Sequence, residues 1–377
     1  MKILEALTDT NIGGAGILLA TRCAYLDRSK YEVTIVLPKG SQLKERFERL
    51  AIDVIEIDAC YDRSFEGRSI PKWIAVLKRI RPELVNCHGC LSCRIAARLC
   101  HVPVLVDTRH CAFPPRKWQT RFPGKYFLGW GMRMLSDQTI AVADAAKQNL
   151  LEMGGDPHRI RVIINGAEAI FPMGEEEKRK TRERLGIPNH AIVVGMFARL
   201  EAYKGHACFL RAASLLIKKN PNFRFLIVGD GSMADALKKE AGRMGIKEYT
   251  LFTGFACDVA PLWNITQIQV NCSVGTETSS LALSEGMSLG IPAVASNFGG
   301  NPYMIRDGEN GFLFPMDQHE ILAERIESIA GDPLLYLRLS KGARRRFEQE
   351  LNAQRMTEET EALYDALLLS KGYRSRG

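Results

Sequence analysis

Short runs of β-branched and other apolar residues alternate with longer amphipathic stretches along most of the chain. In the first half, the expected strands are Lys2–Ala6, Val33–Leu37, Val54–Asp58, Leu84–His88, Val104–Asp107, Thr139–Ala143 and Val162–Asn165. The helical patterns between them include Gly16–Asp27, Ile70–Arg81, Leu91–Cys100 and Asp144–Met153. Near-continuous apolar strands separated by helices indicate parallel strands that are covered on both faces. The alternation therefore predicts an open, doubly wound α/β sheet.

The alternation stops once and then begins again. Residues 171–186 are polar and include the charged run Glu175–Lys180, which predicts a connector leading into a short helix. A second set of expected strands follows at Ala191–Phe197, Phe223–Gly229, Thr250–Gly254, Ile268–Cys272, Ala293–Ser296 and Phe312–Phe314. We expect two Rossmann-like domains, residues 1–170 and 171–352, with a last helix within 353–377 that joins the first domain. Two such sheets in series predict a ligand-binding cleft between them.

Length and composition agree with this organisation. The 377 residues fit two domains of about 150–200 residues each. The ten cysteines are scattered through expected core elements, and the start of the chain has the pattern of a buried strand instead of a signal peptide. These features predict free thiols in a reducing cytoplasm. The net charge of +8 suggests a polyanionic partner: a nucleotide diphosphate, anionic lipid head groups or nucleic acid.

The second half contains the motifs with the clearest chemistry. Arg199 and Lys204 follow an expected strand, where a planar fork and a point charge suit a diphosphate, although a solvated loop explains them equally well. Further on, a loop with Glu277 enters an expected helix with Glu285, and seven residues separate the two carboxylates. Between them, Thr278–Ser280 offer N-cap hydroxyls and free amides, which favour anion binding at the helix start.

In their order along the chain, these motifs resemble the retaining GT-B glycosyltransferases of glycosyltransferase family 4. The family's hallmark is a pair of glutamates with seven residues between them, followed by a small-residue helix and Gly-x-Pro, here Gly290–Pro292. In the first half, Asn11–Gly16 is similar to the family's glycine loop and Asp107–His110 to the segment with its cleft histidine. Asn165–Glu168 is similar to its interdomain crossover. The resemblance extends over the whole chain and implies the GT-B fold.

The resemblance also implies an activity. We expect a metal-independent, retaining hexosyltransferase that moves a sugar from a nucleotide-diphosphate donor, by default a UDP-sugar, to a glycan or lipid-linked acceptor. The usual Glu-Gly-Phe-Gly of the family is Glu277–Ser280 here, so the identity of the hexose stays open. Retention would follow a front-face route in which the leaving phosphate takes the acceptor proton. No metal or cofactor is expected, and the chain contains no Asp-x-Asp motif.

The resemblance assigns roles to individual residues. Arg199 and Lys204 would hold the diphosphate, and Glu285 would bind the ribose. Glu277 would contact the donor sugar, with His110 beside the transferred sugar. The full set of expected donor-binding residues is Gly13, Gly14, Phe255, Thr278, Ser279, Ser280, Leu281 and Glu285. Cationic groups and helix amides that are already in place favour the negative charge that develops on a leaving diphosphate, which agrees with these roles.

Residues 113–133 form a second kind of candidate site. They combine basic and aromatic side chains and include no acidic residue. Such a segment can dock on an anionic membrane surface. It can equally be a half-buried helix with a solvated basic face. Its place in the expected acceptor domain favours a membrane over nucleic acid, so peripheral membrane contact and a half-buried helix both stay open, and nucleic-acid binding is not expected.

The sequence allows three other interpretations. Cys87, His88, Cys90 and Cys93 lie close together, but their spacing matches no ferredoxin pattern, so packing or cleft lining is expected instead of a metal site. A sugar-nucleotide epimerase or hydrolase on the same fold would bind the donor without acceptor-dependent transfer. A non-catalytic scaffold of this fold is disfavoured because it has no need for the diphosphate-binding residues.

Overall fold

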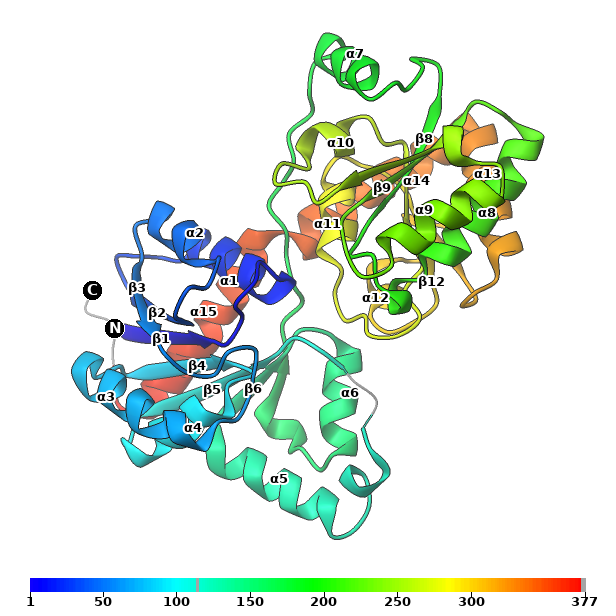
Figure 1. Cartoon of the computed structure of the whole chain (residues 1–377). Helices are drawn as coiled ribbons and strands as arrows, with labels where there is room; N and C mark the ends of the chain where they lie inside the picture. The colour runs from blue at the N-terminus through cyan, green and yellow to red at the C-terminus, as the bar shows by residue number, and fades with distance from the viewer. Residues whose placement is uncertain (113–114, 374–377) are drawn as a thin grey trace. The chain divides into compact units, whose positions relative to one another are not determined.

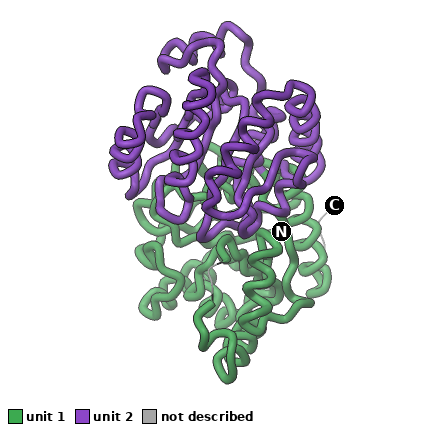
Figure 2. The backbone as a smooth tube through the Cα atoms, turned by 90° about the vertical axis from the view of Figure 1, so that its right-hand side faces the viewer, with its two compact units in different colours: residues 1–166, 353–377 green, residues 167–352 purple. Residues whose placement is uncertain are grey.

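The computed structural model describes residues 1–112 and 115–373. The chain divides into two compact units, shown in different colours in Figure 2. Unit 1 consists of residues 1–166 and 353–377, and unit 2 of residues 167–352. The expected boundary after residue 170 lies four residues beyond Gly166 (170 − 166 = 4), and the last segment belongs to unit 1.

Unit 1 contains a seven-stranded sheet with the order β3-β2-β1-β4-β5-β6-β7. The strands, all paired in parallel, are β1 (Lys2–Leu7), β2 (Glu32–Pro38), β3 (Asp53–Ile57), β4 (Leu84–His88), β5 (Val104–Arg109), β6 (Gln138–Ala141) and β7 (Ile160–Val162). The helices are α1 (Gly14–Tyr25), α2 (Lys44–Arg49), α3 (Ile70–Ile80), α4 (Leu91–Leu99), α5 (Gly124–Leu135), α6 (Asp144–Glu152) and α15 (Ala353–Ser370). In Figure 1, the red helix α15 lies beside α1, although more than 300 residues separate them in the chain. Strand order reverses between β1 and β4, so the carboxyl ends of these two strands lie side by side, with Leu7 opposite His88.

The two faces of this sheet are covered by different helices. Leu4 and Ala6 of β1 pack into the core beneath α3 and α4, where Trp73 is fully buried. Leu7 faces the other way, into the core beneath α1 and α2. Because successive side chains of a strand point to opposite faces, Glu5 must share the face of Leu7.

Unit 2 contains a six-stranded parallel sheet with the order β10-β9-β8-β11-β12-β13. Its strands are β8 (Ile192–Phe197), β9 (Phe223–Val228), β10 (Thr250–Gly254), β11 (Ile268–Asn271), β12 (Ala293–Ser296) and β13 (Gly311–Phe314). The helices are α7 (Glu175–Arg184), α8 (His206–Lys219), α9 (Ala234–Arg243), α10 (Ala260–Asn264), α11 (Leu281–Ser288), α12 (Asn301–Met304), α13 (His319–Gly331) and α14 (Pro333–Arg346). The largest core cluster joins α8 and α13 to the sheet, and Phe209 and Phe225 meet edge to face within it with 5.7 Å between ring centroids.

Two expectations about secondary structure were wrong. The strand expected at Val162–Asn165 is β7, Ile160–Val162, because its ladder with β6 pairs Ala141 with Val162 and ends there. The charged run Glu175–Lys180 is not a connector but the beginning of α7. Acidic residues in the first turn and ion pairs one turn apart, such as Glu175 with Lys178, stabilise a helix that lacks an apolar stripe.

No helix in the described part of the chain is both long enough and apolar enough to cross a membrane.

Candidate active site

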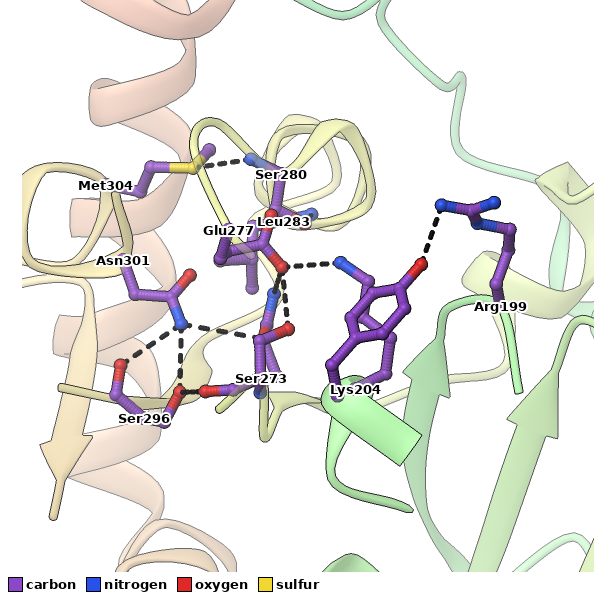
Figure 3. Close-up of polar contacts among 11 residues, drawn as sticks. Arg199, Lys204, Ser273, Glu277, Ser280, Leu283, Ser296, Asn301 and Met304 are labelled. Carbon is purple, nitrogen blue, oxygen red and sulfur yellow. Dashed lines mark hydrogen bonds and ion pairs between the residues drawn. The ribbon is translucent and has the colours of Figure 1, made fainter. Parts of the chain in front are cut away.

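The Glu277 carboxylate is the centre of a polar cluster in unit 2 (Figure 3). Its Oε2 atom accepts hydrogen bonds from Lys204 Nζ at 2.8 Å, Ser273 Oγ at 2.7 Å and Asn271 Nδ2 at 3.2 Å. The side chain of Glu277 is 7% exposed and that of Lys204 is 17% exposed. Two residues that were predicted to hold different parts of a ligand therefore form one partly buried ion pair.

Local backbone geometry explains the position of Lys204. The short helix η4 (Ala202–Lys204) ends at Gly205, which has a φ of +74°. A Cβ atom at Gly205 would lie 2.1 Å from the carbonyl oxygen of Cys272, so no other residue fits without moving the backbone. The amide of Val274 donates to the carbonyl of Tyr203 at 2.8 Å and ties this turn to the loop that leads to Glu277.

A pair of glycines holds the Glu277 loop from the other side. The Gly300 amide donates to the Glu277 carbonyl at 3.1 Å. A Cβ atom at Gly300 would lie 1.3 Å from the carbonyl oxygen of Thr278, and one at Gly299 would lie 2.2 Å from that of Glu277. Glycines are therefore required at the contact between the loop of Gly299 and Gly300 and the loop of Glu277. This contact limits the movement of the Glu277 backbone.

Arg199 is exposed, unlike Lys204 and Glu277. It follows β8 and donates from Nη2 to the Tyr203 hydroxyl at 2.7 Å. The Arg199 guanidinium and the Lys204 ammonium lie 6.0 and 5.8 Å from the centroid of the Tyr203 ring. Tyr203 thus contacts both cations, and the sequence reasoning did not single it out. An aromatic residue directly before the lysine was the available signal.

The start of α11 is arranged differently from the prediction. Ser280 alone is the N-cap, with Oγ accepting from the Leu283 amide at 3.4 Å, and Leu281 is the first helical residue. Thr278 and Ser279 are buried in the loop before the helix, and Ser279 Oγ has no hydrogen-bond partner within the described residues. The expectation of three capping hydroxyls was therefore wrong. The amide of Ser280 donates to the Met304 sulfur at 3.2 Å (Figure 3).

Glu285 lies on α11 and has an aromatic partner that the sequence did not reveal. The indole Nε1 of Trp263 donates to Glu285 Oε2 at 3.1 Å. The Trp263 ring stacks on Phe197, with centroids 3.5 Å apart and planes within 8°. Phe197 and Trp263 also line a small pocket together with Asn271 and Ser280. This hollow in unit 2 therefore adjoins the partners of both glutamates.

Of the other candidates, Gly13, Gly14 and His110 belong to unit 1, and Phe255 belongs to unit 2. Gly13 is the N-cap of α1 and Gly14 is its first residue, and both lie in unit 1. Their role in donor binding stays a prediction. Phe255 follows β10 in unit 2, and its side chain is 60% exposed. Its role in donor binding also stays a prediction. His110 belongs to unit 1, just after β5.

His110 belongs to a buried polar chain. His88 Nδ1 lies 2.7 Å from His110 Nε2, and the two rings are stacked with centroids 5.0 Å apart. His88 Nε2 lies 2.8 Å from Glu5 Oε2, and Arg22 forms an ion pair with Glu5 Oε1 at 2.5 Å. Burial, together with the charges of His88 and Arg22, lowers the pKa of His110 well below its usual value. His110 is therefore neutral near pH 7. Sequence reasoning missed Glu5, for which a lone carboxylate in an apolar strand was the signal.

The cysteines do not assemble a metal site in the part of the chain that the structure describes. Cys87, Cys90 and Cys93 are all buried in the hydrophobic core beneath α3 and α4. No group of three or more His, Cys, Asp or Glu side chains within residues 1–112 and 115–373 is placed to hold a metal ion.

Comparisons with known proteins agree with this geometry. Residues 12–171 match the model of the family described as Glycosyltransferase Family 4, and residues 177–346 match the one described as Glycosyl transferases group 1. The chain belongs to glycosyltransferase family 4. The resemblance that the motifs indicated is thereby confirmed, and the protein is a glycosyltransferase of the GT-B type.

Individual relatives of this glycosyltransferase cover most of its length. EpsD of Bacillus subtilis (strain 168) is 28% identical over 316 residues, which are 78% of this chain and 82% of EpsD. The UDP-Gal:alpha-D-GlcNAc-diphosphoundecaprenol alpha-1,3-galactosyltransferase of Escherichia coli is 27% identical over 314 residues, 81% of this chain and 80% of that enzyme. The crystal structure of Anabaena Alr3699/HepE in complex with UDP superposes with a TM-score of 0.84 at 22% identity, over 97% of this chain and 100% of that one. The last comparison concerns the fold, and it confirms the predicted GT-B class with two Rossmann-like domains.

Proposed function

We propose that this glycosyltransferase is a retaining hexosyltransferase that uses a UDP-sugar and acts without a metal ion. The observation that carries the proposal is the cluster of Arg199, Lys204 and Glu277, held in place by glycine contacts and adjoined by Glu285 on α11. The names of two similar proteins support UDP: one relative is a UDP-galactose-dependent transferase, and one solved structure of the same fold contains UDP. In this proposal unit 2 binds the donor and unit 1 the acceptor.

The cluster fits the chemistry of a leaving diphosphate. When the bond between the sugar C1 and the phosphate oxygen breaks, negative charge develops on the diphosphate, and fixed cations stabilise that charge most. Arg199 is exposed and can form a bidentate contact, whereas Lys204 can share its ammonium between Glu277 and a phosphate oxygen. The acceptor oxygen bonds to C1 on the same face, and its proton passes to the leaving phosphate. The acceptor is a glycan or a lipid-linked sugar.

Isothermal calorimetry in EDTA tests the donor site. UDP, GDP and ADP are titrated into the purified protein, its Lys204→Ala variant and a matched Lys219→Ala variant, in which a surface lysine of unit 2 is removed. We expect UDP to bind without metal, Lys219→Ala to bind it equally well, and Lys204→Ala to lose most of the affinity. If no nucleotide binds, or if Lys204→Ala binds as well as the wild type, the site is wrong and the scaffold function replaces it.

A second measurement separates transfer from the rival reactions of the same fold. The protein is incubated with a UDP-hexose, with and without a lipid-linked glycan acceptor, and the products are separated by chromatography. A transferase releases UDP mainly when the acceptor is present. Release of free hexose without acceptor would indicate a hydrolase, and a changed hexose still attached to UDP would indicate an epimerase. The configuration of the new linkage, read by NMR, tests retention.

We also propose that unit 1 docks on an anionic membrane surface through the segment 115–133, which continues into α5. This contact would place the enzyme at the cytoplasmic face of a membrane. Five aromatic side chains on this segment are between 55% and 82% exposed: Trp118, Phe122, Tyr126, Phe127 and Trp130. Exposed cations accompany them at Arg116, Lys117, Arg121 and Arg133. Aromatic and basic side chains together suit the head-group region of an anionic bilayer. Residues 113 and 114 of the predicted segment lie outside the described residues.

Vesicle sedimentation tests the docking surface. The protein is mixed with vesicles of phosphatidylcholine alone or with added phosphatidylglycerol. We expect binding to the anionic vesicles that weakens with salt and is lost in a Phe127→Ser, Trp130→Ser variant. The matched control, Leu334→Ser with Leu337→Ser, removes two exposed apolar side chains from unit 2 and should still bind. Equal sedimentation of both variants would remove the membrane from the proposal.

A further inference from the structure

The side chain of Tyr203 contacts both cations of the candidate active site. Its hydroxyl oxygen accepts a hydrogen bond from Arg199 Nη2 at 2.7 Å. The Arg199 guanidinium and the Lys204 ammonium lie 6.0 and 5.8 Å from the centroid of its ring. These two distances are close to the outer limit for the attraction between a cation and an aromatic ring, about 6 Å. The hydroxyl therefore makes the stronger contact, and the ring a weak one.

Contacts with the loop that leads to Glu277 fix the position of Tyr203. The Tyr203 carbonyl accepts from the Val274 amide at 2.8 Å. A Cβ atom at Gly275 would lie 2.5 Å from Tyr203 Cβ, so the Tyr203 side chain begins directly against the Gly275 backbone. A larger residue at position 275 would displace it. Tyr203 is therefore held by the same loop that positions Glu277 beside Lys204.

The hydrogen bond with Arg199 uses only the acceptor capacity of the Tyr203 hydroxyl. A guanidinium and an ammonium have donors and no acceptor. Neither Arg199 nor Lys204 can therefore receive the proton of this hydroxyl. The hydroxyl has no other hydrogen-bond partner within residues 1–112 and 115–373. Its proton is thus available to an acceptor atom that comes from outside the chain.

Two carboxylates in this part of unit 2 already have partners. Glu201 accepts from Ser232, through the amide at 3.1 Å and the hydroxyl at 2.7 Å. Glu277 accepts from Lys204 at 2.8 Å. Arg199, in contrast, is exposed and forms no ion pair within the part of the chain that the structure describes. An exposed guanidinium beside a hydroxyl with a free proton suits an anionic group that accepts from both.

We propose that Tyr203 is a third donor to the diphosphate of the nucleotide sugar, with its hydroxyl proton directed at a phosphate oxygen beside Arg199 and Lys204. The inference rests on the proposed function, since it assumes that these two cations bind the diphosphate. A phosphate group presents several oxygens side by side, so one can accept from Arg199 while its neighbour accepts from the Tyr203 hydroxyl. The hydroxyl oxygen meanwhile keeps its bond with the guanidinium. Tyr203 thus binds the phosphate and positions Arg199 together.

Calorimetry with UDP in EDTA measures this contact. Tyr203→Phe keeps the ring and removes only the hydroxyl, and we expect it to bind UDP roughly tenfold more weakly, the loss of one hydrogen bond to a charged group. The matched control is Tyr249→Phe, because Tyr249 also lies in unit 2 and has a cation, Arg224, 5.0 Å from its ring centroid. This control should bind UDP like the wild type. If Tyr203→Phe binds UDP as tightly as the wild type, the proposal is wrong.

A double-mutant cycle separates a direct contact from an effect on Arg199 alone. The affinity for UDP is compared among the wild type, Arg199→Ala, Tyr203→Phe and the double variant, with NMR titration of the UDP signals where binding is weak. A hydroxyl that donates to phosphate keeps part of its effect without the guanidinium. Tyr203→Phe should therefore still weaken binding about threefold or more in the Arg199→Ala background. If the loss disappears in that background, Tyr203 acts only through Arg199 and the direct contact is ruled out.

Comparison of UDP with a UDP-hexose locates the contact on the ligand. UDP carries the diphosphate and no hexose, so a contact with phosphate predicts a similar loss of affinity for both in Tyr203→Phe. A loss with the UDP-hexose alone would place the hydroxyl at the sugar and overturn the proposal. Failure of the proposed function gives a different result, since the wild-type protein then binds no UDP. Failure of this inference alone leaves UDP binding intact in the wild type and in Tyr203→Phe, and lost in Lys204→Ala.

Discussion

The two units each place a glutamate at the carboxyl end of a parallel sheet, but they surround it differently. Glu5 in unit 1 is paired with Arg22, and both side chains are less than 10% exposed. Glu277 in unit 2 is paired with Lys204, whose side chain is 17% exposed and flexible. The first pair lies within a network with partners from β1, α1, β4 and α15. Unit 1 therefore uses a buried ion pair to hold its side chains in fixed positions. Unit 2 instead keeps a lysine that can exchange one anionic partner for another.

Replacing each glutamate should give the largest difference in stability between the two units. Glu5→Ala leaves Arg22 as an unpaired buried cation, and we expect a loss of about 3–5 kcal/mol in the free energy of unfolding. Glu277→Ala should cost less, about 1–2 kcal/mol, because Lys204 can turn toward water. Urea unfolding followed by circular dichroism measures both values. Similar losses in the free energy of unfolding for the two variants would show that the two ion pairs are equally shielded from water.

Arg199 should contribute to ligand binding and not to stability, in contrast to the buried Arg22. Because the Arg199 side chain is exposed, Arg199→Ala should leave the free energy of unfolding nearly unchanged. Its loss removes one charge-assisted contact to the diphosphate, which we expect to weaken UDP binding by about 10- to 100-fold. Calorimetry and urea unfolding on the same preparation provide both readings. A stability loss without a change in UDP affinity would place Arg199 among the structural residues.

Each unit also contains a histidine whose pKa is lowered by burial, which makes the free energy of unfolding depend on pH. Burial and the charge of Lys204 lower the pKa of His206 to about 4, and the pKa of His110 is lowered well below its usual value. Between pH 6.5 and pH 4 the unfolded chain binds protons that the folded chain does not, so stability falls as the pH falls, by at most about 1.4 kcal/mol per pH unit for each histidine.

Replacement of His206 isolates the contribution of unit 2. Neither ring nitrogen of His206 has a hydrogen-bond partner within the described residues, so His206→Leu should fold and lose part of this acid sensitivity. Urea unfolding is measured at pH 7, 6 and 5 for the variant and the wild type. If the free energy of unfolding changes with pH by the same amount in the variant and in the wild type, His206 is not a neutral, buried histidine.

The smallest expected effect concerns Trp263. Trp263→Phe keeps an aromatic ring on Phe197 but removes the N–H group that donates to Glu285. If Glu285 binds the ribose, UDP affinity should fall about fivefold, which corresponds to one ordinary hydrogen bond. The affinity for 2′,3′-dideoxy-UDP, which lacks the hydroxyls, should not change further in the variant. An equal loss for both nucleotides would assign Trp263 to packing alone.

Local patterns were sufficient for most of the elements. Leu84–His88, Thr250–Gly254 and Ala293–Ser296 are strands with the bounds that the sequence indicated. The β-branched runs that predict them depend on near neighbours only. Where the prediction failed, as at Val162–Asn165, the end of the strand depends on the length of its partner β6. Ladder register is a property of two segments, and no single segment contains it.

The candidate site divides in the same way. The spacing of Glu277 and Glu285, and the place of Arg199 and Lys204 after a strand, were visible in the sequence. The side chains that contact these residues were not visible in the sequence. Lys204 and Glu277 are 73 positions apart, and Trp263 and Glu285 are 22 apart, so each pair forms only when the strands of unit 2 take their order in the sheet.

The sequence by itself determined two α/β domains and the motifs of glycosyltransferase family 4, because helical and strand periods and short motifs are local features. Tertiary structure alone decided that Glu5 meets His88 across 83 positions and that His110 completes the chain. Those contacts depend on β1 and β4 becoming neighbours where the strand order reverses. The alternation of side chains about each strand then places these groups on one face, beneath a helix that returns from the far end of the chain.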